Sequence, residues 1–230
     1  RLLQEQRPDK SIQLVSNIVD VSRSQTPFAL RRDWLFIGSF QHPPNTDAVL
    51  FFLKEIYPLI AESLGDAKFY IIGDKVPPEI VSLANEKIIV AGLQRDVGPF
   101  FDSVKLSVAP LRFGAGVKGK INQSMAFGVP VVATSVAVEG TGLHDREEIL
   151  VADEPEDFAK ALIELYQNEQ LWNKISENGL NKTRALYSTD AAHKKLEFLL
   201  SDAHLKSLEL SQPIAEPELV VAADVGPGSE

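Results

Sequence analysis

Six short runs of apolar residues recur along the chain between residues 34 and 153. They are rich in β-branched and aromatic side chains, and the apolar residues follow one another without polar alternation. Such a run is typical of a strand that is buried on both faces, as in a parallel sheet between two layers of helices. The predicted strands are WLFIG (34–38), KFYIIG (68–73), KIIVAG (87–92), KLSVAP (105–110), PVVAT (130–134) and ILVAD (149–153).

Amphipathic stretches of helical period separate and follow these runs. In residues 45–64 the apolar side chains recur at spacings of three and four and form one stripe, and Asn45 or Thr46 can cap the first turn. Pro155 stands where a helix favours proline, in its first turn. We predict helices over residues 45–64 and 118–127, from Pro155 onward, and over residues 169–186 and 189–202.

The repeated alternation of strand and helix predicts an α/β fold, a doubly wound parallel sheet of about six strands with closing C-terminal helices. This Rossmann-like domain is expected to span residues 32–203. Residues 1–31 do not follow the alternation, and we interpret them as the end of an N-terminal domain that is missing here, followed by a linker. Residues 204–230 are rich in Pro, Ala and Glu and are expected to form a disordered acidic tail, with an interaction tail as the alternative.

Composition and charge exclude several classes of function. The 230 residues include 23 Lys plus Arg and 32 Asp plus Glu, and the resulting net charge of −9 argues against a surface built for nucleic acid. The chain has no cysteine, which excludes disulfide scaffolds, thiolate zinc sites and thiol nucleophiles. No apolar run reaches the roughly 20 residues of a membrane span, so we expect a cytoplasmic protein without a transmembrane segment.

The candidate chemistry lies after the fourth predicted strand, in the stretch PLRFGAGVKGKINQS, because ligands of open parallel sheets bind beyond the carboxyl ends of the strands. Gly114, Gly116 and Gly119 match the dinucleotide pattern G-x-G-x-x-G, but residues 111–113 intervene between the strand and this turn. The same letters match the phosphate loop G-x-x-x-x-G-K, but Ile121 stands where that loop needs Ser or Thr to hold magnesium. Neither pattern is therefore complete.

Both patterns share a simpler physical basis, which is anion binding. Closely spaced glycines let the backbone approach an anion and free its N–H groups, and the following helix directs its positive end to the same place. Lys118 and Lys120 fall in the first helical turn, where the helix dipole favours acids, so they cost stability unless an anion is bound nearby. A diphosphate fits this arrangement, and a solvated basic helix start is the alternative.

The stretch PLRFGAGVKGKINQSMAFGVPVVATSVAVEG resembles the C-terminal half of a GT-B glycosyltransferase of the large retaining, family 4-like class known as group 1. The loop GSFQHPPN and the strand ILVAD with its proline-started helix fit the same family, and the resemblance covers roughly residues 12–200. It implies a hexosyl-type transferase in which this half binds the nucleotide-sugar donor and the missing N-terminal domain holds the acceptor. Because the family's reaction occurs in the cleft between the halves, it also implies that this chain alone is inactive.

The resemblance assigns the diphosphate-binding residues. Lys118 and Lys120 match the family's basic pair that contacts the donor diphosphate, and Gly114 and Gly116 match its glycine-rich turn. The family usually carries two glutamates eight positions apart, near the donor sugar and on the ribose.

In this chain Ala115 and Gln123 stand at the two glutamate positions. The amide of Gln123 can still hydrogen-bond a ribose hydroxyl, whereas Ala115 offers no polar group. Gly38 ends the first predicted strand, and many members place a basic residue in the loop that follows it; here only His42 could take that part.

Three further residues join the candidate donor site through the resemblance. Gly92 and Leu93 end the third predicted strand, where the family holds the base, and Glu139 follows the fifth strand, near the donor sugar or phosphate. A cap for the following turn is the alternative role of Glu139. No residue is assigned as catalytic.

The expected donor is a UDP-, GDP- or related sugar, bound without a metal or another cofactor, because positioning and stabilisation of the departing diphosphate need fixed donors and cations. Two alternatives stay open. One is a degenerate GT-B domain that acts as a non-catalytic scaffold or interaction domain, which the loss of both glutamates favours. The other is a nucleotide-sugar epimerase or a P-loop-like nucleotide-binding protein.

Overall fold

The computed structural model describes residues 5–6, 17–114 and 119–201. The chain divides into two compact units, one of residues 14–194 and one that combines residues 1–13 with residues 195–230. The larger unit contains the whole sheet and the candidate site. The predicted domain limits at residues 31 and 203 stay a prediction.

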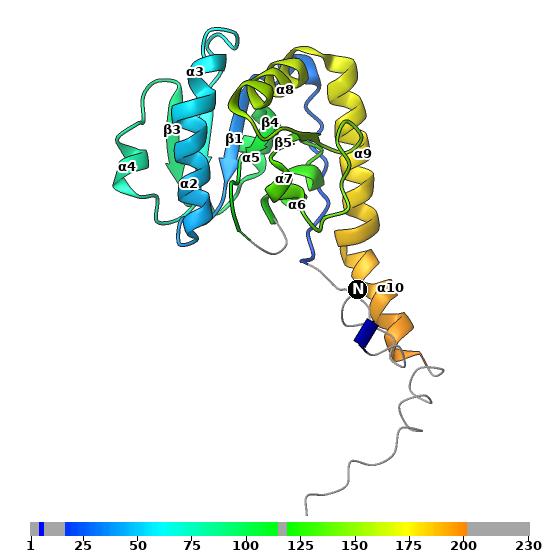
Figure 1. Cartoon of the computed structure of the whole chain (residues 1–230). Helices are drawn as coiled ribbons and strands as arrows, with labels where there is room; N and C mark the ends of the chain where they lie inside the picture. The colour runs from blue at the N-terminus through cyan, green and yellow to red at the C-terminus, as the bar shows by residue number, and fades with distance from the viewer. Residues whose placement is uncertain (1–4, 7–16, 115–118, 202–230) are drawn as a thin grey trace, which may run out of the picture. The chain divides into compact units, whose positions relative to one another are not determined.

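The sheet has six strands, all parallel, in the order β3-β2-β1-β4-β5-β6 (Figure 1). Each predicted apolar run overlaps one of these strands, and the prediction of an α/β fold with a doubly wound parallel sheet is confirmed. The central strands are buried along most of their length, which explains why their sequences do not alternate. The strands are β1 Asp33–Ile37, β2 Phe69–Ile72, β3 Ile88–Gly92, β4 Val104–Ala109, β5 Val131–Ala133 and β6 Leu150–Val151.

Each predicted helical stretch overlaps a helix of the structure, and the structure adds three short helices, α4, α5 and α7, that the sequence did not predict. The first stretch is continuous from Pro43 to Ile60 but passes through a π-helical segment, η2, between α2 and α3. The described helices are α2 Pro43–Phe51, η2 Phe52–Ile56, α3 Tyr57–Ile60, α4 Pro78–Val81, α5 Gly98–Ser103, α6 Gly119–Ala126, α7 Ser135–Val138, α8 Pro155–Gln167, α9 Glu169–Tyr187 and α10 Thr189–Leu200, with a short 3-10 turn, η1, at Phe28–Leu30.

The first helix begins earlier than its sequence predicts. Two prolines occupy its first positions, His42 is the N-cap residue, and no side chain caps the helix. Asn45 therefore lies inside the first turn, and the expectation that Asn45 or Thr46 caps the helix is wrong. The reason is that proline fits the first helical turn, where its missing N–H costs nothing. This shift leaves the side chain of Asn45 available for another role.

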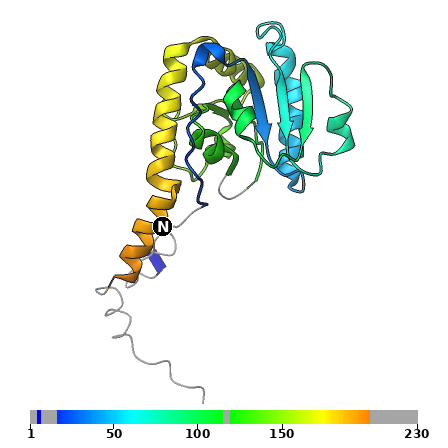
Figure 2. The same ribbon diagram turned by 180° about the vertical axis from the view of Figure 1, so that it is seen from behind.

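Alternate residues of the strands build two cores on opposite faces of the sheet. On the face seen in Figure 1, α2, α3 and α8 cover Phe36 and Phe69, and the ring of Phe52 lies 4.8 Å from that of Phe69. On the face seen in Figure 2, α5 covers Leu35 with Phe101. The period of two along β1 thus sends neighbouring residues into different cores.

The order of the strands gives the sheet one topological switch point, between β1 and β4. After β1 the chain builds β2 and β3 on one side and then crosses to β4 on the other side. The loops that leave the carboxyl ends of β1 and β4 therefore diverge. In doubly wound sheets the crevice between such diverging loops is where ligands bind.

The segment before β1 is fastened to the domain by backbone hydrogen bonds. The N–H groups of Ser22 and Ser24 donate to the carbonyls of Ala126 (3.1 Å) and Phe127 (3.1 Å), at the end of α6. The N–H of Val19 donates to the carbonyl at the end of α9 (2.9 Å). Residues 19–24 thus pack on the helices that flank the switch point.

Candidate functional site

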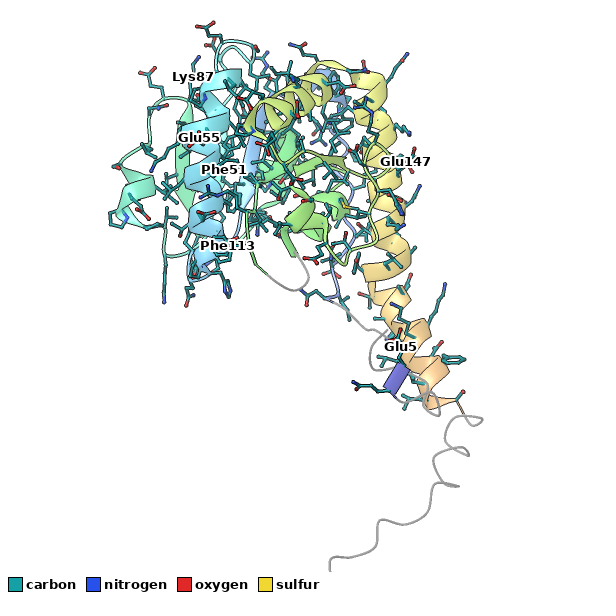
Figure 3. All side chains as sticks on the ribbon, in the orientation of Figure 1. Glu5, Phe51, Glu55, Lys87, Phe113 and Glu147 are labelled. Carbon is teal, nitrogen blue, oxygen red and sulfur yellow. The ribbon has the colours of Figure 1, made fainter. Side chains whose placement is uncertain are left out.

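A cavity of about 470 Å³ opens at the switch point between β1 and β4. Its walls come from the loop after β1, the first turn of α2, the loop after β4 and the first turns of α6. Figure 3 shows the half-exposed ring of Phe113 at this edge of the sheet, beside the N-terminal end of α2. The lining residues are Ile37, Gly38, Ser39, His42, Pro44, Asn45, Leu111, Phe113, Gly114, Gly119, Lys120 and Gln123.

Lys120 and Asn45 form the polar centre of the cavity wall. The ammonium of Lys120 donates to Oδ1 of Asn45 (2.8 Å), although the two residues are 75 positions apart. Nδ2 of Asn45 donates in turn to the carbonyl of Ser39 (2.7 Å), and only 5% of Asn45 is exposed. The Lys120 ammonium also lies 5.4 Å from the centre of the Phe36 ring. A cation is therefore held at a defined place between the two diverging loops.

Two glycines at the strand ends allow this close packing. A Cβ on Gly38 would lie 2.8 Å from Nδ2 of Asn45, which is closer than real contacts allow. A Cβ on Gly73, just after β2, would lie 1.9 Å from the carbonyl oxygen of Gly38. A side chain at Gly38 would therefore displace the amide of Asn45, whereas a side chain at Gly73 would collide with the backbone of Gly38.

The loop after β4 is anchored on both sides of the cavity. Buried Thr134, at the end of β5, donates its hydroxyl to the carbonyl of Leu111. Arg112 forms a two-pronged ion pair with Asp47 of α2, and its guanidinium lies 4.9 Å from the centre of the Phe51 ring. The hydrogen bonds with Asp47 raise the pKa of Arg112, so this cross-link between the loop and α2 stays charged.

A second cavity of about 540 Å³ adjoins the first along α6. The two cavities share Gly119 and Gln123 as lining residues. The far wall of the second is formed by Asn17–Asp20 and by Val97, the residue before α5. An elongated ligand could therefore extend from the Lys120 end of the first cavity past Gln123 into the second.

A sequence model of a known family matches this part of the chain. The family is described as Glycosyl transferases group 1, and the match covers residues 31–168, more than half of the chain. The chain belongs to this family. Its matched region includes the complete sheet and every residue that lines the first cavity.

Two curated relatives have similar sequences. An uncharacterised 44.6 kDa protein of the cps region of Klebsiella pneumoniae is 25% identical over 164 residues, 67% of this chain and 42% of the relative. An uncharacterised glycosyltransferase of Methanocaldococcus jannaschii is 28% identical over 149 residues, 63% of this chain and 41% of the relative. This group 1 chain therefore spans less than half the length of these relatives.

Solved structures share the fold. A TarM variant from S. aureus, in a complex that includes UDP, superposes with a TM-score of 0.67 at 18% sequence identity. The matched region covers 85% of this chain and 42% of the TarM chain. The C-terminal domain of LpcC, a group 1 protein from Francisella tularensis, superposes with a TM-score of 0.57 at 16% identity, over 76% of this chain and 97% of that domain. At such identities the likeness establishes the fold, which is that of the C-terminal half of a GT-B glycosyltransferase.

The structure of this group 1 domain brings some of the predicted site residues together. Gly38, Gly114, Lys120 and Gln123 line the first cavity, from three different segments of the chain. Gly114 has a positive φ of 122°, and a Cβ there would lie 3.2 Å from Cγ of Pro44, so the glycine permits the close approach of the two loops. Ala115, Gly116 and Lys118 lie outside the described residues.

Other predicted residues lie at the same edge of the sheet but do not line the cavity. Gly92 is the last residue of β3, the outermost strand, and Leu93 after it is 74% exposed. Glu139 is the exposed C-cap residue of α7. A role of these residues in donor binding stays a prediction.

The sequence reasoning missed Ser39, Phe113 and the role of Asn45 in the cavity wall. Ser39 also belongs to a polar cluster at the rim, where Gln41 donates to Asp74 (2.7 Å) and Lys75 donates to Gln41 (3.3 Å). Hydrogen bonds from Ser39 and Gln41 lower the pKa of Asp74, so this exposed acid stays ionised near the cavity. The only available signal was the position of these residues in the loop after the first strand.

The described part of the chain offers neither a cluster of metal ligands nor a membrane-spanning helix. Residues 5–6, 17–114 and 119–201 contain no group of three or more His, Asp or Glu side chains that could hold a metal ion. Within the same residues, no helix is long and apolar enough to cross a membrane.

Proposed function

We propose that the cavity at the switch point binds the diphosphate of a nucleotide-sugar donor, and that the chain is the donor-binding half of a hexosyl-type glycosyltransferase. The observation that carries this proposal is the Lys120 ammonium, held between the loops of β1 and β4 in a cavity of about 470 Å³. A cation fixed in this way can bind a ground-state diphosphate and stabilise the charge that develops as the diphosphate departs.

The surroundings of Lys120 supply further contacts for an anion. Lys120 lies in the first turn of α6, whose N-terminal N–H groups have no partner within the helix and whose dipole favours negative charge. We propose that Gly114 and Gly116 let the backbone approach the phosphates and that Lys118 adds a second cation. Gly38 leaves room for the network that fixes Lys120.

The nucleoside is proposed to extend into the second cavity. We propose that the amide of Gln123, which lines both cavities, hydrogen-bonds a ribose hydroxyl. The base would then lie toward Val97 and the end of β3, near Gly92 and Leu93. The donor sugar would occupy the opposite end of the first cavity, and the assignment of Ala115 and Glu139 to the sugar stays a prediction from the sequence. UDP in the complex of TarM, which shares this fold, supports a UDP-sugar among the donors to test.

We propose that residues beyond this chain bind the acceptor. The chain spans 42% and 41% of the lengths of its two curated relatives, and group 1 enzymes of the GT-B fold have two halves. The 230 residues alone are therefore expected to bind the donor but not to transfer its sugar. Donor binding is proposed to need no metal, because lysine and backbone N–H groups supply the positive charge.

Calorimetric titration with UDP, GDP, ATP with magnesium, and NAD tests the proposal. We expect one nucleoside diphosphate to bind, with the same affinity in EDTA as in magnesium. The substitution Lys120→Met should weaken this binding about ten- to hundredfold, the worth of one charge-assisted hydrogen bond. Lys54→Met is the matched control, because Lys54 is exposed on η2, away from the cavity, and should bind like the wild type.

Other outcomes would point to the alternative functions. Tight binding of ATP that requires magnesium would contradict the proposal and favour a P-loop-like protein, and preferential binding of NAD would favour an epimerase-like site. No binding of any nucleotide would favour a non-catalytic GT-B scaffold. Equal affinities of Lys120→Met and wild type would contradict the assignment of the cavity.

A further inference from the structure

We propose that Asn45 is a positioning residue, which holds the Lys120 ammonium in the direction of the donor diphosphate without neutralising its charge. The inference rests on the proposed function and goes beyond it, because it assigns the geometry of the cation to a residue on a different element. Asn45 is in the first turn of α2, whereas Lys120 is in the first turn of α6.

The hydrogen bonds of Asn45 fix the orientation of its amide. The Ser39 carbonyl can only accept a hydrogen bond, so the NH₂ group of Asn45 must face it (2.7 Å). The amide oxygen then faces away from Ser39 and accepts from the Lys120 ammonium (2.8 Å). Both ends of a side chain in a residue that is only 5% exposed are thus occupied, and the amide cannot rotate without losing a partner.

The sequence around Asn45 supports this fixed arrangement. The prolines before it start α2 two residues earlier, so Asn45 is not used as a cap and points into the cavity wall. Gly38 leaves the space that the amide occupies, since a Cβ there would lie 2.8 Å from Nδ2 of Asn45. The prolines at the start of α2 and the glycine at position 38 therefore both contribute to the position of the Asn45 amide.

An amide is the suitable group for this task. Its oxygen is a strong acceptor for an ammonium, yet it carries no net charge, so the contact with Asn45 does not itself neutralise Lys120. A carboxylate at the same place would form an ion pair with Lys120 and compete with the diphosphate. Holding the lysine in advance also spares the ligand the entropy cost of ordering a long side chain.

A purely structural role is the competing explanation, because Asn45 also joins α2 to the loop after β1. The two explanations differ in what a substitution changes. A structural role predicts lower stability and an equal loss of affinity for every part of the nucleotide. A positioning role predicts a loss that is confined to the phosphates and that vanishes when Lys120 is absent.

The test is a double-mutant cycle with Asn45→Ala, Lys120→Met and the double variant. Each folded variant is titrated with UDP or GDP, whichever binds the wild type more tightly, by calorimetry, and with the matching nucleoside by NMR. We expect Asn45→Ala to weaken diphosphate binding about tenfold and nucleoside binding less than about twofold. In the Lys120→Met background, Asn45→Ala should change diphosphate affinity less than about twofold.

Two further variants keep the test decisive. Asn85→Ala is the matched control, because Asn85 accepts hydrogen bonds from the N–H groups of Lys87 and Ile88 in a turn before β3 and has a structural role there. It should lower stability without a selective loss of diphosphate affinity. If Asn45→Ala does not fold, Gly38→Ala displaces the same amide and should weaken diphosphate binding in the same selective way.

The experiment distinguishes a failure of the positioning role from a failure of the proposed function. If the wild type binds the diphosphate and Lys120→Met does not, but Asn45→Ala binds like the wild type or loses nucleoside affinity equally, the positioning role is overturned and the proposed function stands. Additive effects in the cycle would overturn it as well. If the wild type binds no nucleoside diphosphate, the proposed function is overturned, and the inference with it.

Discussion

The two ends of the strand pair β1 and β4 both hold cations, Arg31 fully buried at one end and Lys120 partly buried at the other, but they hold them differently. At the amino ends, the guanidinium of Arg31 donates to the carbonyls of Thr26 (2.8 Å), Phe101 (2.6 Å) and Val104 (2.8 Å) and lies 5.3 Å from the centre of the Trp172 ring. Burial lowers the pKa of Arg31 to about 10. At the carboxyl ends, the Lys120 ammonium faces a cavity.

Lys105 is a second cation at the amino ends whose contacts all come from the protein itself. Its ammonium lies between the rings of Phe28 (3.9 Å) and Tyr166 (4.4 Å) and donates to the Tyr166 carbonyl (3.1 Å), and burial lowers its pKa. The surroundings of Arg31 and Lys105 are filled by rings and carbonyls of the protein, so these cations serve the fold. The difference teaches that a cation held by the protein's own polar groups indicates an anion site only where a cavity remains beside it, as at Lys120.

The largest expected effect is on stability, at the amino ends. Arg31→Met leaves two buried carbonyls and one partly buried carbonyl without the Arg31 donor, and it should lower the free energy of unfolding by about 3 kcal/mol. Urea denaturation followed by circular dichroism measures this change. Affinity for the nucleoside diphosphate, measured on the folded fraction, should stay within about twofold of the wild type. A selective loss of nucleotide affinity would contradict the proposal that the cation at the amino ends of β1 and β4 serves only the fold.

The second prediction compares two lysines in one assay. Lys105→Met keeps most of the aliphatic stem between the rings but removes the cation–π contacts, so it should lower stability by about 1 kcal/mol and leave nucleotide affinity unchanged. Lys120→Met should do the reverse, with a change in stability below about 1 kcal/mol and a large loss of affinity. The contrast fails if both variants lose affinity to the same degree.

A smaller effect is expected where α9 meets β4. The indole N–H of Trp172 donates to the carbonyl of Lys105, and Trp172→Phe removes this hydrogen bond but keeps an aromatic ring beside Arg31. Thermal unfolding should show a loss of about 1 kcal/mol, with unchanged diphosphate affinity. A loss above about 3 kcal/mol would show that the indole packing, and not the hydrogen bond, dominates this end of the sheet.

The smallest effect concerns pH at the rim of the cavity. The folded state lowers the pKa of Asp74 below its ordinary value of 3.8, so the stabilisation from this acid is present above that value and is lost as the pH falls through the lower folded pKa. In Asp74→Asn, the free energy of unfolding should depend less steeply on pH below about pH 4. An unchanged slope would show that the hydrogen bonds from Ser39 and Gln41 do not favour the carboxylate.

The fold was predictable because its signals are local. Runs such as WLFIG and KLSVAP are apolar on successive residues since both faces of β1 and β4 are covered, and Pro155 marks the start of α8. The rule that ligands bind at the carboxyl ends of parallel strands then located the edge of the sheet. The rule does not say how far the ends of different strands lie from one another along that edge. Leu93 and Glu139 were therefore assigned to the same site as residues that line the cavity, although neither of them lines it.

The centre of the site was predictable only in part. The glycines and Lys120 indicate an anion site because they form one short motif. The contact of Asn45 with Lys120 joins residues 75 positions apart, and it depends on the exact turn at which α2 begins. The sequence offers Asn45 as a cap or as a wall residue, and the choice depends on whether α2 begins at Asn45 or, as the structure shows, at Pro43.

A crystal structure of the chain with UDP or GDP tests the central claim most directly, since it shows which cation the phosphates meet. The account predicts phosphate oxygens about 2.7–3.2 Å from Nζ of Lys120, with the Asn45 amide in place and the ribose beside Gln123. A nucleotide bound outside the switch-point cavity, or bound there with its phosphates turned away from Lys120, would contradict it.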